Sequence, residues 1–227
     1  MKIFDNANDF IRQGFKVLKI KGGINVDEDI ERLIKTREAV GKSIEIRFDA
    51  NQGYSVEESI RFVKETQKVK VELLEQPAPY DELGKMAQVT SKTNIPIMAD
   101  ESVFDHHDAF RLASMGACDY FNIKFSKSGG ICNALKIVAL AEAAGIKCQV
   151  GCMSESRFAL SALMHLVLAR DTIVHYDMDS SLMLDADPVT GGIEYQGAGL
   201  WTIGESPGIG AGFDEAFLET MDKFTIS

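Results

Sequence analysis

The sequence contains no uninterrupted apolar run of about 18 residues or more, so we expect no transmembrane helix. The first ten residues, MKIFDNANDF, carry no apolar signal segment, and we therefore expect a cytoplasmic protein. Positive charge is in short supply: 24 Lys and Arg stand against 34 Asp and Glu, which gives a net charge of −10 at pH 7. A chain this acidic is a poor candidate for binding nucleic acid or an anionic membrane.

Cysteine is scarce among the 227 residues. The four cysteines are Cys118, Cys132, Cys148 and Cys152. None forms a CxxC pair, so their spacing does not support a zinc site, and reduced thiols are the expected state.

What the sequence does contain is a regular alternation. Short apolar, β-branched runs alternate with longer amphipathic stretches, and the centres of the short runs lie about 24 to 29 residues apart. The expected strands are Phe15–Ile20, Ile44–Phe48, Val71–Leu74, Ile95–Met98, Tyr120–Ile123, Ile146–Val150 and Ile173–Tyr176. Alternating strands and helices predict a parallel α/β sheet that is buried on both faces.

Polar side chains at the carboxyl ends of these strands favour a closed barrel over an open sheet, because a barrel gathers such ends at one mouth. They are Lys19, Lys21, Asp49, Glu75, Asp100, Lys124 and Asp177. A closed barrel needs eight strands and only seven are visible, so the fold is predicted as a TIM-like (β/α) barrel that lacks its first strand. We assign residues 1–184 to the barrel units.

Residues 185–227 differ from the repeats, since they are glycine-rich and contain only short strand-like pieces. These pieces are Gly192–Tyr195 and Leu200–Ile203, and a last helix is expected at about Asp214–Lys223. We expect this tail to pack on the barrel.

Three carboxylates recur at the strand ends. Asp49, Glu75 and Asp100 follow one another at intervals of 26 and 25 residues, one repeat each. Adjacent strands would place them side by side, where three like charges repel unless a cation lies between them. Hard oxygen ligands favour Mg²⁺, with Mn²⁺ as a substitute. The alternative is that each acid caps a helix or pairs with a lysine.

Lysines flank this predicted metal site. Lys19 and Lys21 lie two apart at a strand end, so both side chains point the same way, and the crowding of two ammonium groups should lower a lysine pKa toward the range of a base. Lys124 ends a strand on the other side of the barrel. A solvated surface pair is the alternative for Lys19 and Lys21.

Asp177 and Asp179 in the run HYDMDSS also share one face, and a pair of acids at a barrel mouth can bind a substrate ammonium group. A loop salt bridge or a helix cap is the alternative. The run SKSGG at 126–130 could form a phosphate loop, but its spacing fits neither a Walker motif nor a dinucleotide fingerprint.

Together the runs LKIKGG, FDANQGYS, LLEQPAP, MADES, NIKFSKSGG, GCMSESR and DMDSSLML resemble the barrel domain of the enolase superfamily. Within it the sequence is most similar to the muconate-lactonizing subgroup, and there to the dipeptide epimerases. The resemblance covers the chain from about Asp9 to Gly212, with the motifs in order at one-repeat spacings.

The resemblance implies a magnesium-dependent epimerase that inverts the α-carbon of a dipeptide's C-terminal residue by 1,1-proton transfer through an enediolate. Enolase-superfamily sites that use a lysine or histidine base with magnesium are a worked example of this chemistry. Asp49, Glu75 and Asp100 match the metal ligands. Lys21 and Lys124 match the two acid/base lysines, and Lys19 the neighbour that tunes Lys21. The pair Asp177 and Asp179 matches the residues that bind the dipeptide's α-ammonium group.

Members of this family carry an N-terminal capping domain that closes over the substrate, and no such domain is recognisable in this sequence. The expected partners are therefore a small dipeptide and either a second copy in a homo-oligomer or a chain that supplies the cap. Two alternatives stay open: a muconate cycloisomerase or o-succinylbenzoate synthase, which share the metal and lysines, and an inactive truncated barrel.

Overall fold

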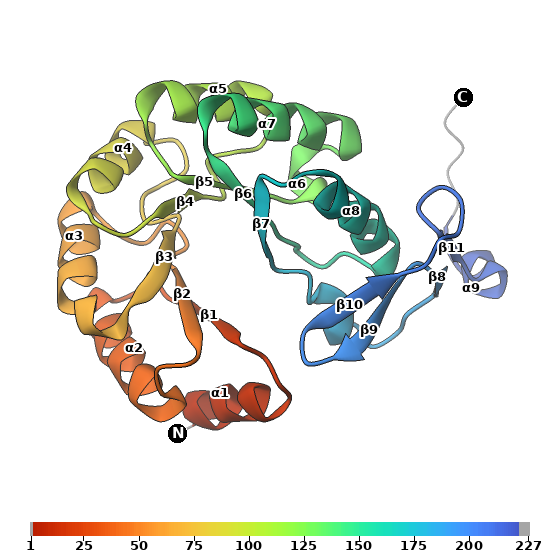
Figure 1. Ribbon diagram of the computed structural model, residues 1–227, viewed down its shortest axis with the longest axis horizontal. Coiled ribbons are helices and arrows are strands. Elements are labelled where there is room, and N and C mark those ends of the chain that lie inside the picture. Colours follow the sequence, from red (N-terminus) through yellow and green to blue (C-terminus); the bar gives the residue numbers. More distant parts are fainter. Residues whose placement is uncertain (1, 223–227) are drawn as a thin grey trace.

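The computed structural model describes residues 2–222, with side chains from Ala7 onward. Seven strands form one parallel sheet whose spatial order follows the chain, and the sheet curls around a central axis (Figure 1). The strands are β1 (Val17–Lys21), β2 (Glu45–Asp49), β3 (Val71–Glu75), β4 (Ile97–Ala99), β5 (Tyr120–Ile123), β6 (Lys147–Val150) and β7 (Ile173–Tyr176). Each lies within two residues of the bounds predicted from the sequence.

Helices connect the strands and cover the outside of the curl (Figure 1). They are α2 (Val26–Val40), α3 (Val56–Glu65), α4 (Leu83–Lys92), α5 (His106–Met115), the single turn α6 (Phe125–Ser128), α7 (Ile131–Ala144) and α8 (Arg157–Ala169). A further helix, α1 (Lys2–Arg12), precedes β1, and two 3₁₀ turns, η1 (Gln67–Val69) and η2 (Ser180–Met183), follow α3 and β7.

Local sequence signals set the helix ends. Asn25 caps α2 by accepting hydrogen bonds from the backbone N–H groups of Asp27 and Glu28. Ser55 and Glu58 form a reciprocal capping box at the start of α3. Gly145 ends α7 in the left-handed conformation, as its position after the alanine run predicts.

The main core lies between the sheet and the helices. Phe48 of β2 packs on Phe62 of α3 with ring centroids 4.5 Å apart, and both are fully buried. Leu33, Leu112 and Ile137 bury the inner faces of three other helices in the same cluster.

The barrel is open between β1 and β7. No strand among residues 2–222 pairs with the outer edge of either. The chain thus forms a curled α/β half-barrel of seven strands, and the expectation of a TIM-like barrel without its first strand is confirmed.

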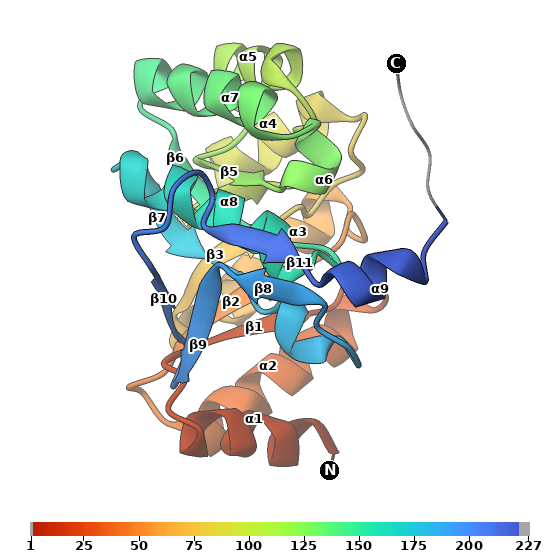
Figure 2. The same cartoon turned by 90° about the vertical axis from the view of Figure 1, so that its right-hand side faces the viewer.

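The tail after β7 forms two small antiparallel sheets on the same side as the opening (Figure 2). Their strands are β8 (Val189–Gly191) with β11 (Ala211–Phe213), and β9 (Ile193–Gly197) with β10 (Leu200–Ile203). The sequence did not predict β8 and β11, whose three residues each are too short to show a pattern. The last helix is α9 (Glu215–Glu219), and the predicted end at Lys223 lies outside the described residues.

Contacts of the tail with the barrel are specific. Arg157 of α8 donates hydrogen bonds to the backbone oxygens of Val189, Gly191 and Ile193. On the opposite side of the opening, Phe15 stacks on Tyr195 at 6.5 Å. The hairpin of β9 and β10 therefore contacts the segment that leads into β1. The division at residue 184 itself remains a prediction.

No helix within residues 2–222 combines the length and the apolar character that a membrane span requires.

Candidate active site

The three predicted carboxylates lie side by side at the carboxyl edge of the sheet. Asp49 and Glu75 are the last residues of β2 and β3 and are register partners, and Asp100 directly follows β4. Their exposed fractions are 0%, 1% and 2%. Burying three carboxylates so completely requires compensating positive charge.

Lysines from β1 supply part of that charge. Lys19 Nζ lies 2.9 Å from a Glu75 oxygen, 3.4 Å from Asp49 Oδ2 and 3.1 Å from Asp177 Oδ2. Lys21 Nζ lies 3.4 Å from the same Asp49 oxygen, but 65% of its side chain is exposed. Both lysines point to one face, as predicted, and Lys21 is the one that a substrate in solution can reach.

Asp100 is held from both sides. Lys124, the N-cap residue of α6, donates to Asp100 Oδ2 at 2.6 Å. Lys127, one turn later, donates to Asp100 Oδ1 at 2.6 Å and also to the Asp100 backbone oxygen. The sequence analysis did not single out Lys127.

The pKa shifts follow from this arrangement. Burial, together with the charges of Asp49 and Asp100, raises the pKa of Glu75 to about 7 against the opposing effect of Lys19. Burial alone would lower the pKa of Lys19, but the carboxylates around it outweigh burial and raise it, and Asp100 does the same for Lys124. The expectation of a lysine pKa lowered by crowding is therefore wrong for Lys19, because its nearest charges are carboxylates.

The donor chemistry fits a hard divalent cation, although the side chains are not arranged around one. Within residues 2–222 no three His, Cys, Asp or Glu side chains stand close enough together to hold a metal ion. Lysine ammonium groups lie between the acids instead. Asp49 Oδ2 is buried without a hydrogen-bond donor, its only cations lying 3.4 Å away. A buried, underused carboxylate oxygen beside two further acids is suited to Mg²⁺.

Two amide side chains that the sequence analysis missed organise the acids. Gln76 adopts a positive φ of 36°, and its Oε1 accepts from the backbone N–H groups of Asp100 and Ser102. Asn122 donates to Glu75 Oε1 at 2.9 Å. Glutamine after a strand-end acid carries little signal by itself, since the bonds that its Oε1 accepts span 24 and 26 residues of sequence.

The loops after β1 and β2 touch through glycine. A Cβ on Gly23 would lie 1.8 Å from the backbone oxygen of Ala50, and one on Gly53 would lie 1.7 Å from the backbone oxygen of Gly23. Only residues without a side chain permit this approach. The glycines thereby bring the lysine-bearing end of β1 against the Asp49 loop.

Asp177 and Asp179 lie at the end of β7, as predicted. Asp177 faces Lys19, while Asp179 is 3.6 Å from the sulfur of Cys152. Burial and the neighbouring Asp177 raise the pKa of Asp179. The two acids share an environment in which an added cation would be stabilised.

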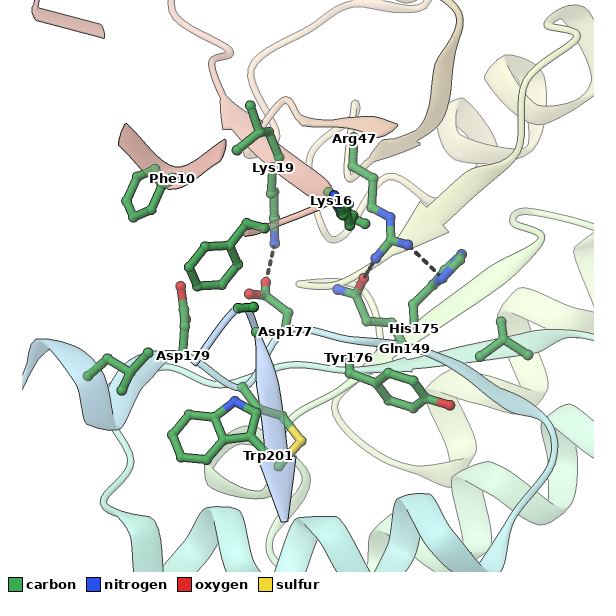
Figure 3. Close-up of a pocket in the computed structure, with 18 of the residues that line it drawn as sticks. Phe10, Lys16, Lys19, Arg47, Gln149, His175, Tyr176, Asp177, Asp179 and Trp201 are labelled. Carbon is green, nitrogen blue, oxygen red and sulfur yellow. Dashed lines mark hydrogen bonds and ion pairs between the residues drawn. The ribbon is translucent and has the colours of Figure 1, made fainter. Parts of the chain in front are cut away.

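A cavity of about 590 Å³ lies between β1 and β7 (Figure 3). Lys19, Asp177 and Asp179 line it near the mouth, and Trp201 of β10 borders it from the tail. Figure 3 shows the Lys19 side chain reaching across it to Asp177.

Deeper in the barrel a second polar layer crosses the same space (Figure 3). Arg47 of β2 donates to Glu72 at 2.6 Å and to His175 Nδ1 of β7 at 2.8 Å, and His175 stacks on Tyr120 at 5.2 Å. Burial and the Arg47 charge lower the pKa of His175. The sequence analysis did not predict this layer.

Comparison with known families agrees with the geometry. Residues 2–217 match the model of the enolase C-terminal domain-like family, so the chain belongs to that family. The D-Ala-D/L-Ala epimerase of Cytophaga hutchinsonii is 41% identical over 226 residues, which cover 100% of this chain and 61% of that protein. The L-Ala-D/L-Glu epimerase of Clostridium acetobutylicum is 44% identical over 204 residues, 89% of this chain and 57% of that protein.

Solved structures give the same result. The dipeptide epimerase of Cytophaga hutchinsonii, complexed with Mg and D-Ala-L-Val, superposes with a TM-score of 0.94 at 41% identity, covering 97% of this chain and 60% of that one. The dipeptide epimerase of Enterococcus faecalis, complexed with Mg and L-Leu-L-Tyr, gives 0.88 at 40% identity, covering 92% and 59%. The resemblance to the enolase-superfamily barrel is confirmed, and the chain spans about 60% of the length of these relatives.

Proposed function

We propose that this chain is the barrel part of a magnesium-dependent isomerase that epimerises the C-terminal residue of a dipeptide. The observation that carries the proposal is the order of groups around the mouth. Three buried carboxylates on consecutive strands, Asp49, Glu75 and Asp100, have Lys21 on one side and Lys124 on the other.

Asp49, Glu75 and Asp100 would hold the Mg²⁺ ion, with Mn²⁺ as a substitute. When bound, the ion supplies positive charge for the substrate's carboxylate as the α-proton leaves. Binding requires the ammonium group of Lys19 to give up its contacts with Asp49 and Glu75, and that of Lys124 its contact with Asp100. The released Lys124 then faces the substrate, while Lys19 keeps its contact with Asp177.

Proton transfer falls to Lys21 and Lys124. One neutral lysine removes the α-proton, and the other, as an ammonium group, delivers a proton to the opposite face of the same carbon. The centre is inverted, and the lysines have exchanged protonation states until solvent resets them. In the reverse direction they exchange roles. Lys19 stays close to Lys21 and acts on its charge, not on the substrate.

Asp177 and Asp179 would bind the α-ammonium group of the dipeptide. Asp177 already holds an ammonium group, that of Lys19, at 3.1 Å, and a substrate cation would take the same position. Two acids there suit an α-ammonium group better than the anionic substrates of a muconate cycloisomerase or an o-succinylbenzoate synthase. Those activities remain the alternative, since they share the metal and the lysines.

The names of the relatives leave the substrate side chains open. They include D-Ala-D/L-Ala, L-Ala-D/L-Glu and hydrophobic dipeptide epimerases. The remaining 40% or so of such proteins' length would come from outside this chain, as a capping segment or a partner chain, and a homo-oligomer would be a further way to close the site.

The test is deuterium incorporation. A library of L,L-dipeptides is incubated with the chain and Mg²⁺ in D₂O and read by mass spectrometry, with a parallel sample in EDTA. Exchange of particular dipeptides that EDTA abolishes is the expected result and names the substrate. If the chain also fails when a capping domain from a relative is fused to it, the epimerase proposal is wrong. Exchange by the fusion alone would identify this chain as an incomplete enzyme.

A further inference from the structure

Lys127 is the most deeply buried cation of the site, and the proposed chemistry gives it no task. Only 2% of its side chain is exposed, against 11% for Lys124. Its Nζ is hydrogen-bonded to Asp100, and its side chain is too deeply buried for a substrate in solution to reach it. A buried ammonium group is costly unless every N–H finds an acceptor.

Within the part of the chain that the structure describes, the hydrogen-bond acceptors of Lys127 both belong to one residue. Its Nζ donates to Asp100 Oδ1 at 2.6 Å and to the Asp100 backbone oxygen. Two acceptors of the same residue, one on the side chain and one on the main chain, fix the rotation of the carboxylate about its side-chain bonds. The other oxygen, Oδ2, is thereby directed to the mouth, where Lys124 now contacts it.

The run SKSGG explains how Lys127 comes to this position. Lys124 is the extended N-cap of the single turn α6, Lys127 follows three residues later within the turn, and both side chains reach Asp100. Gly129 and Gly130, with φ of 74° and 91°, end the turn at once. A longer helix would carry the chain away from Asp100. The glycine pair does not fit a phosphate loop. Its effect is to end the turn shortly after Lys127, so that the turn stays beside Asp100.

We propose that Lys127 is a positioning residue, which holds the Asp100 carboxylate in the one orientation that presents Oδ2 to the Mg²⁺ ion. The inference rests on the proposed function, because it assumes that Asp100 is a metal ligand. It assigns the two oxygens different tasks: Oδ1 is anchored by Lys127, and Oδ2 exchanges between Lys124 and the ion.

The two possible roles of Lys127, as a nearby charge and as an orienting donor, predict changes of opposite sign in Mg²⁺ affinity when the ammonium group is removed. If Lys127 acted only as a nearby positive charge, its loss would tighten Mg²⁺ binding, since like charges repel. If it orients Asp100, its loss frees the carboxylate to rotate and weakens binding. Removing partners that orient metal ligands typically lowers metal affinity about 10- to 100-fold.

The experiment is a calorimetric titration of the full chain with Mg²⁺ for the wild type, Lys127→Met and Lys127→Gln. Lys64→Met, on the exposed face of α3, is the matched control. We expect Lys127→Met to bind Mg²⁺ at least about tenfold more weakly, Lys127→Gln to lie between it and the wild type because its amide NH₂ group can still donate without carrying a charge, and Lys64→Met to be unchanged. Equal or tighter binding by Lys127→Met overturns the proposal. If that variant does not fold, Lys127→Gln decides by the same criterion.

A crystal structure of the Lys127 variant separates this inference from the epimerase proposal. If the wild type takes up no Mg²⁺, the metal-dependent function fails, and the carboxylate of Asp100 is then the readout. A rotated carboxylate in the variant supports the positioning role. An unchanged orientation with both oxygens in place overturns it, whatever the metal does.

Discussion

Lys19 of β1 and Asp177 after β7 are 158 residues apart and ion-paired at 3.1 Å, across the opening between β1 and β7, which no strand within residues 2–222 closes. The pair is partly shielded, with 17% and 28% of the side chains exposed. This side-chain contact thus helps to hold β1 and β7 together, whereas backbone hydrogen bonds join the other neighbouring strands.

Asp177→Asn should therefore destabilise the fold as well as the site. The substitution removes the charge partner of Lys19 at the opening, and we expect the free energy of unfolding to fall by about 1–2 kcal/mol, as for a charged hydrogen bond that is partly exposed. Urea unfolding measures the change. Asp171→Asn, on the exposed turn before β7, is the control. Equal losses for both variants would show that the contact across the opening contributes nothing.

Lys21→Ala and Lys124→Ala should each reduce dipeptide epimerisation by at least about 10²-fold, because each removes the proton carrier on one face. The two should differ in single-turnover exchange, since the remaining lysine can still exchange the α-proton of the enantiomer that it faces. Lys68→Ala, on the outer surface, is the control. Full turnover in either site variant contradicts the two-lysine assignment.

Magnesium should stabilise the chain. At a concentration 100 times its Kd, an ion bound only by the native state adds about 2.7 kcal/mol to the free energy of unfolding. Thermal melting with and without Mg²⁺ measures this. Asp49→Asn should abolish the increment, because it replaces a buried carboxylate, while Glu38→Gln on the exposed face of α2 should keep it. If Mg²⁺ does not change the melting temperature of the wild type, the barrel has no working metal site.

Gly151 follows β6 and leaves room for the site. A Cβ there would lie 2.5 Å from Asn122 Oδ1 and 3.0 Å from Lys124 Cε, so Gly151→Ala must displace both side chains. Misplacement of a catalytic group by about 1 Å can lower the rate about 10²-fold. We expect such a loss with little change in stability. Gly84→Ala in α4, where a Cβ meets nothing within 4 Å, should leave the rate intact. Comparable rates for the two variants would refute the steric argument.

His175 should make stability depend on pH. The folded state lowers its pKa through burial and the Arg47 charge, while Glu72, Tyr120 and Lys147 also face the ring. Since the unfolded chain binds the proton more readily, stability is full above about pH 6.5 and falls as the pH drops toward the folded pKa, by at most about 1.4 kcal/mol per pH unit. Glu75, whose pKa is raised to about 7, contributes a slope of the opposite sign in this range and is present in both proteins. Urea unfolding between pH 7.5 and pH 5.5 should therefore show the stability of the wild type falling relative to that of His175→Gln as the pH drops. Parallel profiles would exclude His175 as the cause.

Much of the fold could be predicted from local pattern. The carboxylates Asp49, Glu75 and Asp100 recur at the same spacing as the strands. The repeat by itself therefore places them on neighbouring strands. The short strands β8 and β11 were missed because three residues carry no periodicity. The polar layer of Arg47, Glu72 and His175 was missed because its members come from strands 25 and 128 residues apart.

The sequence by itself determined the class of fold, the open place in the barrel and the positions that carry charge at the mouth, since these follow from periodicity and from residue type at strand ends. Only the tertiary structure decided how those charges pair. Lys19, whose crowding with Lys21 was expected to lower a lysine pKa, lies among three carboxylates that raise its own pKa. Lys127, to which the sequence analysis assigned no role, is the deepest cation of the site. Whether two charged side chains form an ion pair depends on their distance across the barrel. Packing sets that distance, so no local segment of the sequence predicts it.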